Sequence, residues 1–126
     1  PYVDWEYYSS LYTDLEENQF YKYVQKASVK LDAKTHRRVG EFERNYCQDT
    51  ATEFQKQVHM QIQNTMCELI NAFHMQETTG VGTGVKSVTN DGYSETYNIT
   101  TTAEMEEELR AIVRSGLSGT GLAGAL

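Results

Sequence analysis

The sequence has little of what covalent cross-linking and membrane insertion require. It contains two cysteines, Cys47 and Cys67, and a single proline in 126 residues. Two cysteines cannot build a disulfide framework, and on one helix these two would lie about 30 Å apart, so we expect both to be free thiols. No apolar run approaches the ~20 residues of a membrane span, and no basic-then-apolar leader opens the chain. We therefore expect a soluble protein made in the cytoplasm.

Positive charge is also scarce. Eleven Lys and Arg stand against 18 Asp and Glu, a net charge of −7, which is the opposite of the balance in a general nucleic-acid binder. The charge is unevenly spread, because residues 1–20 hold five acids and no Lys or Arg, whereas residues 21–44 hold seven bases and three acids. These oppositely charged regions either orient neighbouring subunits or are simply solvated surfaces.

No residue pattern predicts catalysis or metal binding. The glycine-rich loop at residues 80–84 follows a predicted helix and precedes predicted strands, which is not the order of a dinucleotide-binding loop. His36, His59 and His74 do not form, with each other or with the cysteines, the close pairs typical of metal sites. We therefore predict that the protein is not an enzyme and that it has no catalytic residue, no cofactor and no metal.

Helical periodicity organises most of the chain. Asp4 can cap a short helix near the N-terminus. Three capping-box spacings then mark further helix starts, at Thr13–Glu16, Thr50–Glu53 and Thr101–Glu104. The helix after the first box should end near Thr35. The one after the second box, about residues 48–76, repeats its apolar residues at about 3.7 positions and is the longest predicted element.

Other segments break this helical pattern. Residues 36–46 contain Gly40 and are expected to form a connector, and residues 85–97 alternate around Asn90-Asp91-Gly92 as a β-hairpin does. The last ten residues contain three glycines, which disfavour a helix. We predict a mainly α domain, residues 1–116, with about four helices and the hairpin 85–97 inserted before the last helix. A flexible glycine-rich C-terminal tail, residues 117–126, would follow.

Tyrosine is abundant at the start of the chain. Six of the nine tyrosines fall within the first 23 residues, more than one small core can enclose: Tyr2, Tyr7, Tyr8, Tyr12, Tyr21 and Tyr23. Tyrosine is enriched at protein interfaces, and aromatic rings can also stack on bases. Because residues 1–20 hold no Lys or Arg, protein contact is the better interpretation.

The order of short motifs resembles a known family. An early Trp-Glu-Tyr-Tyr at 5–8 precedes a helix with Ala27-Ser28 and Leu31-Asp32, then Thr35 and Arg38-Val39, the long helix, Lys86-Ser-Val-Thr-Asn-Asp-Gly-Tyr-Ser94 and Leu117-Ser-Gly-Thr-Gly-Leu122. This order resembles the small head–tail connector proteins (adaptor or head-completion proteins) of tailed bacteriophages and prophages, particularly those of Gram-positive hosts. The similarity spans most of the chain. Apart from Arg38-Val39, residues 36–50 match nothing in that family, and neither do the residues beyond Leu122.

The resemblance implies a structural protein of the virion. Such subunits assemble with their own copies as a closed ring, usually of about twelve, beneath the portal protein. The ring extends the DNA channel, through which DNA passes without specific binding, and receives the stopper or tail-completion protein. No membrane is involved.

The resemblance also implies two contact sites. The C-terminal segment would dock on the portal through Leu117, Gly119, Thr120, Gly121 and Leu122. The hairpin would contact another subunit or the next ring through Val85, Val88, Asn90, Asp91, Gly92, Tyr93 and Tyr97.

The sequence leaves two other functional hypotheses open. A small cytoplasmic regulator of phage origin would bind one partner through the tyrosine-rich face, would be a monomer or dimer, and would be absent from virions. An enzyme would require the loop at residues 80–84 or the histidines and cysteines to bind a nucleotide or a metal.

Overall fold

The protein is mainly α-helical. The computed structural model describes residues 2–79 and 102–124, and these ranges contain five helices and no strand. The helices are α1 (Trp5–Leu11), α2 (Glu17–Lys34), α3 (Arg38–Asn45), α4 (Glu53–Thr79) and α5 (Thr102–Gly116). The predicted fold class is thereby confirmed at the level of mainly α. The predicted hairpin, residues 85–97, and the Thr101–Glu104 box, which includes Thr101, involve positions outside the described residues.

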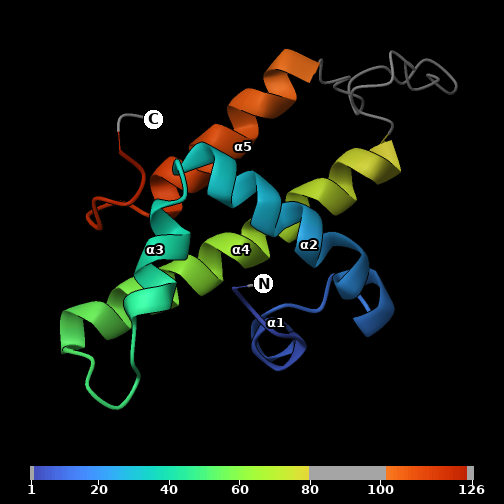
Figure 1. The fold of residues 1–126 in the computed structure, drawn as a ribbon. Coiled ribbons are helices and arrows are strands. Elements are labelled where there is room, and N and C mark those ends of the chain that lie inside the picture. Colours follow the sequence, from blue (N-terminus) through green and yellow to red (C-terminus); the bar gives the residue numbers. More distant parts are fainter. Residues whose placement is uncertain (1, 80–101, 125–126) are drawn as a thin grey trace, which may run out of the picture.

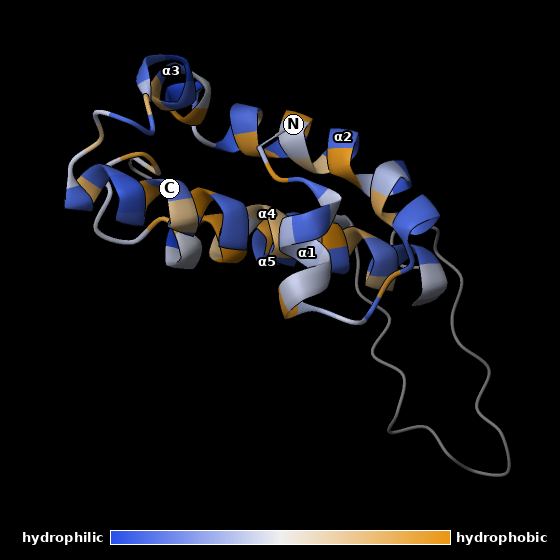
Figure 2. Ribbon diagram, turned by 90° about the horizontal axis from the view of Figure 1, so that it is seen from below, coloured by the Kyte–Doolittle hydropathy of each residue, from blue (hydrophilic) through white to orange (hydrophobic). Residues whose placement is uncertain are grey.

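Four helices form two layers around one core. α2 packs along α4, and α4 packs along α5 (Figure 1). Seen from below, α2 and α3 lie over α4 and α5 (Figure 2). The periodicity predicted for α4 is confirmed along most of its length, because one face is buried: Val58, Ile62, Met66, Leu69 and Phe73. Phe54 and Leu11 lie at the ends of α4 and α1 and are 60% and 56% exposed.

The helix starts follow the predicted chemistry, but two of them lie at shifted positions. Asp4 caps α1 as predicted, since its Oδ1 accepts a hydrogen bond from the Tyr7 N–H at 2.8 Å. The box expected at Thr50–Glu53 is instead formed by Thr52 and Gln55, which exchange two hydrogen bonds of 2.9 and 3.1 Å. Likewise the box before α2 uses Glu16 and Gln19. In both cases glutamine takes the place of the expected glutamate.

The expected connector, residues 36–46, contains α3, so the count of four helices was one too low. His36 and Arg37 both adopt left-handed backbone conformations, with φ of 53° and 65°, and this reverses the chain between α2 and α3. Gly40, interpreted as a helix breaker, lies inside α3. A Cβ at this position would be 3.1 Å from the Tyr2 hydroxyl oxygen, so glycine here permits the N-terminal segment to approach closely.

None of the helices in residues 2–79 and 102–124 combines the length and the apolar character that crossing a bilayer requires.

Candidate interaction surfaces

The first part of the C-terminal segment is folded onto the helical body. The Leu117 N–H donates to the Val113 carbonyl at 3.0 Å, and the Leu117 side chain is 1% exposed within the core. From α4, the Gln61 side-chain amide donates to the carbonyl oxygens of Gly116 and Ser118, at 3.2 and 2.9 Å. The expectation of a flexible tail beginning at Leu117 was therefore wrong for its described part, because a buried leucine and a glutamine on another helix hold it.

The next residues form a tight turn at the surface. The Thr120 N–H and hydroxyl both donate to the Leu117 carbonyl, at 3.1 and 2.7 Å, and the hydroxyl oxygen accepts from the Leu122 N–H at 3.0 Å. Gly119 and Gly121 have φ of +80° and +78°, and their Cβ positions face open space. Of the residues predicted to dock on the portal, Gly119, Thr120 and Gly121 therefore form this turn. Leu122 is half-buried against the core, and the Leu117 side chain is not accessible.

The end of the described segment lies against α3. A Cβ at Gly124 would be 2.1 Å from Arg38 Nη1, so the guanidinium of Arg38 covers this glycine. Ala123 is half-buried and packs against the core beside Leu122. The segment thus contacts three helices, α3, α4 and α5.

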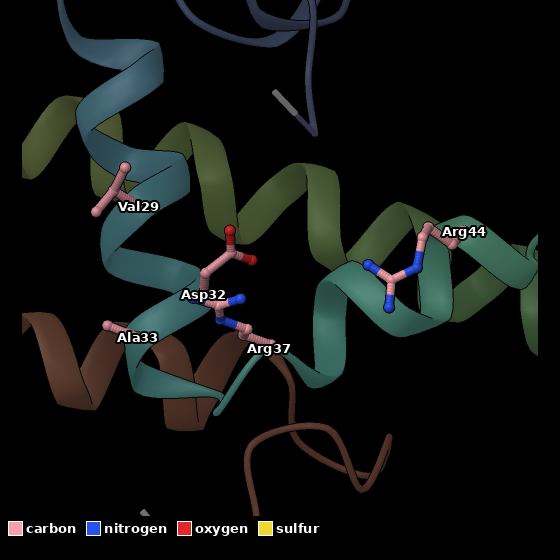
Figure 3. A pocket seen from close by; sticks show the side chains of 5 residues that line it. All are labelled: Val29, Asp32, Ala33, Arg37 and Arg44. Atoms are coloured by element: carbon pink, nitrogen blue, oxygen red, sulfur yellow. The ribbon is translucent and has the colours of Figure 1, made fainter.

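A hollow of about 380 Å³ lies between the end of α2 and α3 (Figure 3). Five side chains line it, and we call this set the basic hollow: Val29, Asp32, Ala33, Arg37 and Arg44. Val29 is 59% exposed, and Arg44 reaches from α3 toward Asp32 (Figure 3). Neither arginine forms an ion pair with any residue that the structure describes. The hollow therefore combines an apolar wall with two guanidinium groups.

The one carboxylate in the basic hollow already has a partner. Asp32 accepts a hydrogen bond from the Tyr2 hydroxyl at 2.5 Å. Burial raises the pKa of Tyr2, and the hydrogen bond to Asp32 raises it further, so the phenol keeps its proton and donates. Asp32 is thus occupied from within the chain, whereas the two arginines are open to an outside acceptor.

Two carboxylates, those of Asp14 and Glu68, lie on the side of the molecule where α1 ends. Leu11 is the last residue of α1 and is 56% exposed, and the backbone of the next residue, Tyr12, is extended. The Asn71 side-chain amide on α4 donates to Asp14 Oδ2 at 3.3 Å, and Glu68 is exposed one helical turn earlier on α4. Burial raises the pKa of Tyr12, and nearby groups that include Glu68 and Asp14 raise it further. We call Leu11, Tyr12, Asp14 and Glu68 the acidic corner.

Most of the tyrosines near the N-terminus are satisfied within the chain. The hydroxyls of Tyr2, Tyr7 and Tyr8 donate to Asp32, Asn64 and Asn71, each at 2.5 Å. Tyr8 and Tyr23 are buried, and Tyr12 stacks on Tyr8 with ring centroids 5.2 Å apart. Of the six tyrosines in the first 23 residues, Tyr21 has a side chain that is largely exposed, at 58%. The predicted tyrosine-rich contact face is therefore reduced, because acceptors on α2 and α4 draw these phenols inward.

The histidines and cysteines are dispersed. His59 pairs with Glu43 at 2.9 Å and stacks on Tyr46 with centroids 4.5 Å apart, which ties α4 to the end of α3. Cys47 is exposed and Cys67 is buried, both as free thiols, as predicted. Across residues 2–79 and 102–124, no group of three His, Cys, Asp or Glu side chains could hold a metal ion.

The loop at residues 80–84 lies outside the described part of the chain. So do the residues predicted to contact another subunit: Val85, Val88, Asn90, Asp91, Gly92, Tyr93 and Tyr97. Comparison with protein-family models, with curated proteins and with solved structures finds no match for this chain. The order of the sequence motifs and the surfaces described above are therefore the features that bear on the function of this protein.

Proposed function

We infer that the protein is a structural head–tail connector subunit of a tailed bacteriophage or prophage. It assembles as a ring beneath the portal, extends the DNA channel and joins the capsid to the stopper or tail. Its role is to make contacts, with copies of itself on two sides and with the portal and the stopper above and below, and it carries out no reaction.

The observation that carries this proposal is the separation of two complementary surfaces. Asp14 of the acidic corner lies two residues before the N-cap of α2, whereas the basic hollow lies at the end of α2, and the 18 residues of this helix span about 27 Å. A subunit with opposite charges on different parts of its surface favours head-to-tail association. Head-to-tail contacts generate rings when the rotation between subunits closes.

The C-terminal turn supports docking on a second kind of partner. Gly119 and Gly121 present main chain to solvent with no side chain in the way, so a partner can approach the backbone closely. Leu117 and Gln61 fix the position from which this turn projects. The turn is thus a preformed contact site on the surface of the subunit, which lowers the entropy cost of binding.

Quantitative mass spectrometry of gradient-purified phage particles tests the proposal. We expect the chain at an abundance close to that of the portal protein, because one ring sits on another of comparable copy number. Its absence from intact, tailed particles would exclude the connector role and favour the small cytoplasmic regulator instead.

A truncation tests the docking assignment separately. Deleting residues 119–126 leaves Leu117 and the hydrogen bonds of Gln61 in place and removes the half-buried Leu122 and Ala123, so helicity should remain close to that of the full chain with a modest loss of thermal stability. Incorporation into particles should be lost. A substitution of Ser118, which is exposed beside the turn, to alanine is the matched control and should be incorporated normally. Normal incorporation of the truncated chain would contradict docking through this segment.

A further inference from the structure

The acidic corner and the basic hollow are opposite in charge, and each contains an exposed apolar side chain. The corner contains one exposed apolar side chain, Leu11, three positions before Asp14 in the chain, together with the carboxylates of Asp14 and Glu68. The hollow has a volume of about 380 Å³, and an exposed apolar side chain, Val29, lines it together with two guanidinium groups. Each surface can therefore supply the other with an apolar side chain to pack against and with charges of opposite sign.

We propose that the acidic corner of one subunit binds in the basic hollow of the next copy, with Leu11 against Val29 and Ala33. The carboxylates of the corner then face the guanidinium groups of the hollow. This inference rests on the proposed function, since it identifies the subunit contact that a ring needs.

A second copy fits better than another partner for two reasons. The two surfaces belong to the same chain and lie on different elements, the corner on the end of α1, the segment after it and α4, and the hollow on the end of α2 and α3. Each subunit can then use one surface on each side, which is the heterologous arrangement that propagates around a ring. In addition, the first 20 residues contain no Lys or Arg to repel the arginines of the hollow.

Enclosing the charges strengthens the contact. In water, single ion pairs between exposed groups contribute little. When Leu11 covers Val29 and Ala33, water leaves the neighbourhood of the arginines, and bidentate pairing with carboxylates becomes stronger and more selective. The apolar contact and the charges therefore act together, and loss of either should weaken assembly.

A disulfide test asks whether the two surfaces meet. In a Cys47→Ser background, Leu11→Cys and Val29→Cys are combined, and assembled rings or particles are oxidised mildly. Disulfides form only when the Cα atoms lie about 4.4–6.8 Å apart, so we expect a ladder of cross-linked oligomers on non-reducing gels. The matched control combines Leu11→Cys with Tyr21→Cys, an equally exposed position on α2 that lies outside the hollow, and should give no ladder.

A charge reversal tests the electrostatic part. Arg44→Glu should weaken assembly at least about tenfold, measured by mass photometry and by abundance in particles, and adding Asp14→Arg should restore part of it. Arg114→Glu makes the same charge change at an exposed position of α5 and should have little effect.

The outcomes separate this inference from the proposed function. If the wild-type chain is abundant in particles but the 11–29 pair gives no ladder and Arg44→Glu behaves as Arg114→Glu does, this contact is wrong and the connector role stands. If the ladder forms with recombinant protein while the chain is absent from virions, the contact is supported and the connector role is lost. If neither a ladder nor particle incorporation is found, both are overturned.

Discussion

The middle of α4 and the C-terminal segment are both ordered, but different interactions hold them. Ile62, Met66 and Leu69 on α4 are completely buried between α2 and α5. The C-terminal segment has one fully buried side chain, Leu117, and two half-buried ones, Leu122 and Ala123, together with hydrogen bonds from Gln61 and Thr120. Packing on two neighbouring helices thus fixes the first region, whereas one buried side chain, two half-buried ones and a few hydrogen bonds fix the second.

This difference indicates how fold and contact are divided in the molecule. Changes in α4 should unfold the whole domain, because its buried face is shared by two neighbouring helices. Changes beyond Leu117 should alter the surface while the helices remain folded. A segment held in this way can keep a defined shape for a partner at small cost to the stability of the body.

The largest effect is expected in α4. Leu69→Ala should lower the free energy of unfolding by about 2–5 kcal/mol, since Leu69 is fully buried and the change leaves a cavity. Urea denaturation followed by circular dichroism measures this loss. Met60→Ala on the same helix is the control, because Met60 is 48% exposed and should change stability by less than about 1 kcal/mol. Equal effects of the two substitutions would contradict the position of α4 in the core.

The next effect should come from the one buried residue of the C-terminal segment. Leu117→Ala should cost about 2–3 kcal/mol, near the lower end of such substitutions, because a site at the end of a helix can relax into the space. It should also increase amide hydrogen exchange in residues 119–124 more than in α4. Ser118→Ala should leave both quantities unchanged. A protected segment after Leu117→Ala would mean that the polar contacts alone hold it.

A smaller effect is expected within the turn. Gly121→Ala should cost about 1 kcal/mol, because φ of +78° is unfavourable for alanine although its Cβ would meet no atom. Thermal melting measures the loss, and the far-ultraviolet circular dichroism of the helices should not change. A gain in stability on this substitution would contradict the left-handed conformation at Gly121.

The smallest effect concerns how α5, which carries the segment, is held on α2. Glu106 pairs with Lys30 at 2.7 Å and Lys34 at 3.3 Å, and the hydrogen bond from Lys30 lowers its pKa below 4.5. A lowered pKa in the folded state adds stability at neutral pH that is lost as the pH falls through that pKa. Because Glu106 is 39% exposed, Glu106→Gln should cost less than about 1 kcal/mol at pH 7.

The pH dependence of that difference provides the check. The stability gap between the wild type and Glu106→Gln should shrink with acidification and vanish below the folded pKa of Glu106. Glu108→Gln, an exposed position of the same helix, should show no such gap at any pH. A gap that persists in acid would assign the effect to packing in place of charge.

Periodicity in the sequence was sufficient to predict the central helices. α2 and the buried face of α4 follow from apolar spacing alone, since that spacing directly reflects which face is covered. The helix starts were shifted by two or three residues because Gln19 and Gln55 form the same cap as glutamate does. α3 was missed because Gly40 disfavours a helix locally, and the close approach of Tyr2 that favours glycine there is a tertiary contact.

The candidate surfaces were less accessible from sequence. The basic character of residues 21–44 was evident, but Lys30 and Lys34 are occupied by Glu106, which lies on a distant helix. Only folding shows that Arg37 and Arg44 line one hollow. In the same way, the glycines after Gly116 indicated flexibility, whereas the hydrogen bonds from Gln61 could not be foreseen from composition.

The contrast between the two thiols has a practical consequence for counting subunits. Cys47 is exposed, and hydrogen bonds from the Thr50 side chain and from the backbone N–H groups of Asp49 and Thr50 lower its pKa. Burial raises the pKa of Cys67 to about 12. A maleimide dye at neutral pH should therefore label the native chain once per copy, without any engineered cysteine. Stepwise photobleaching of labelled assemblies would then report their copy number directly.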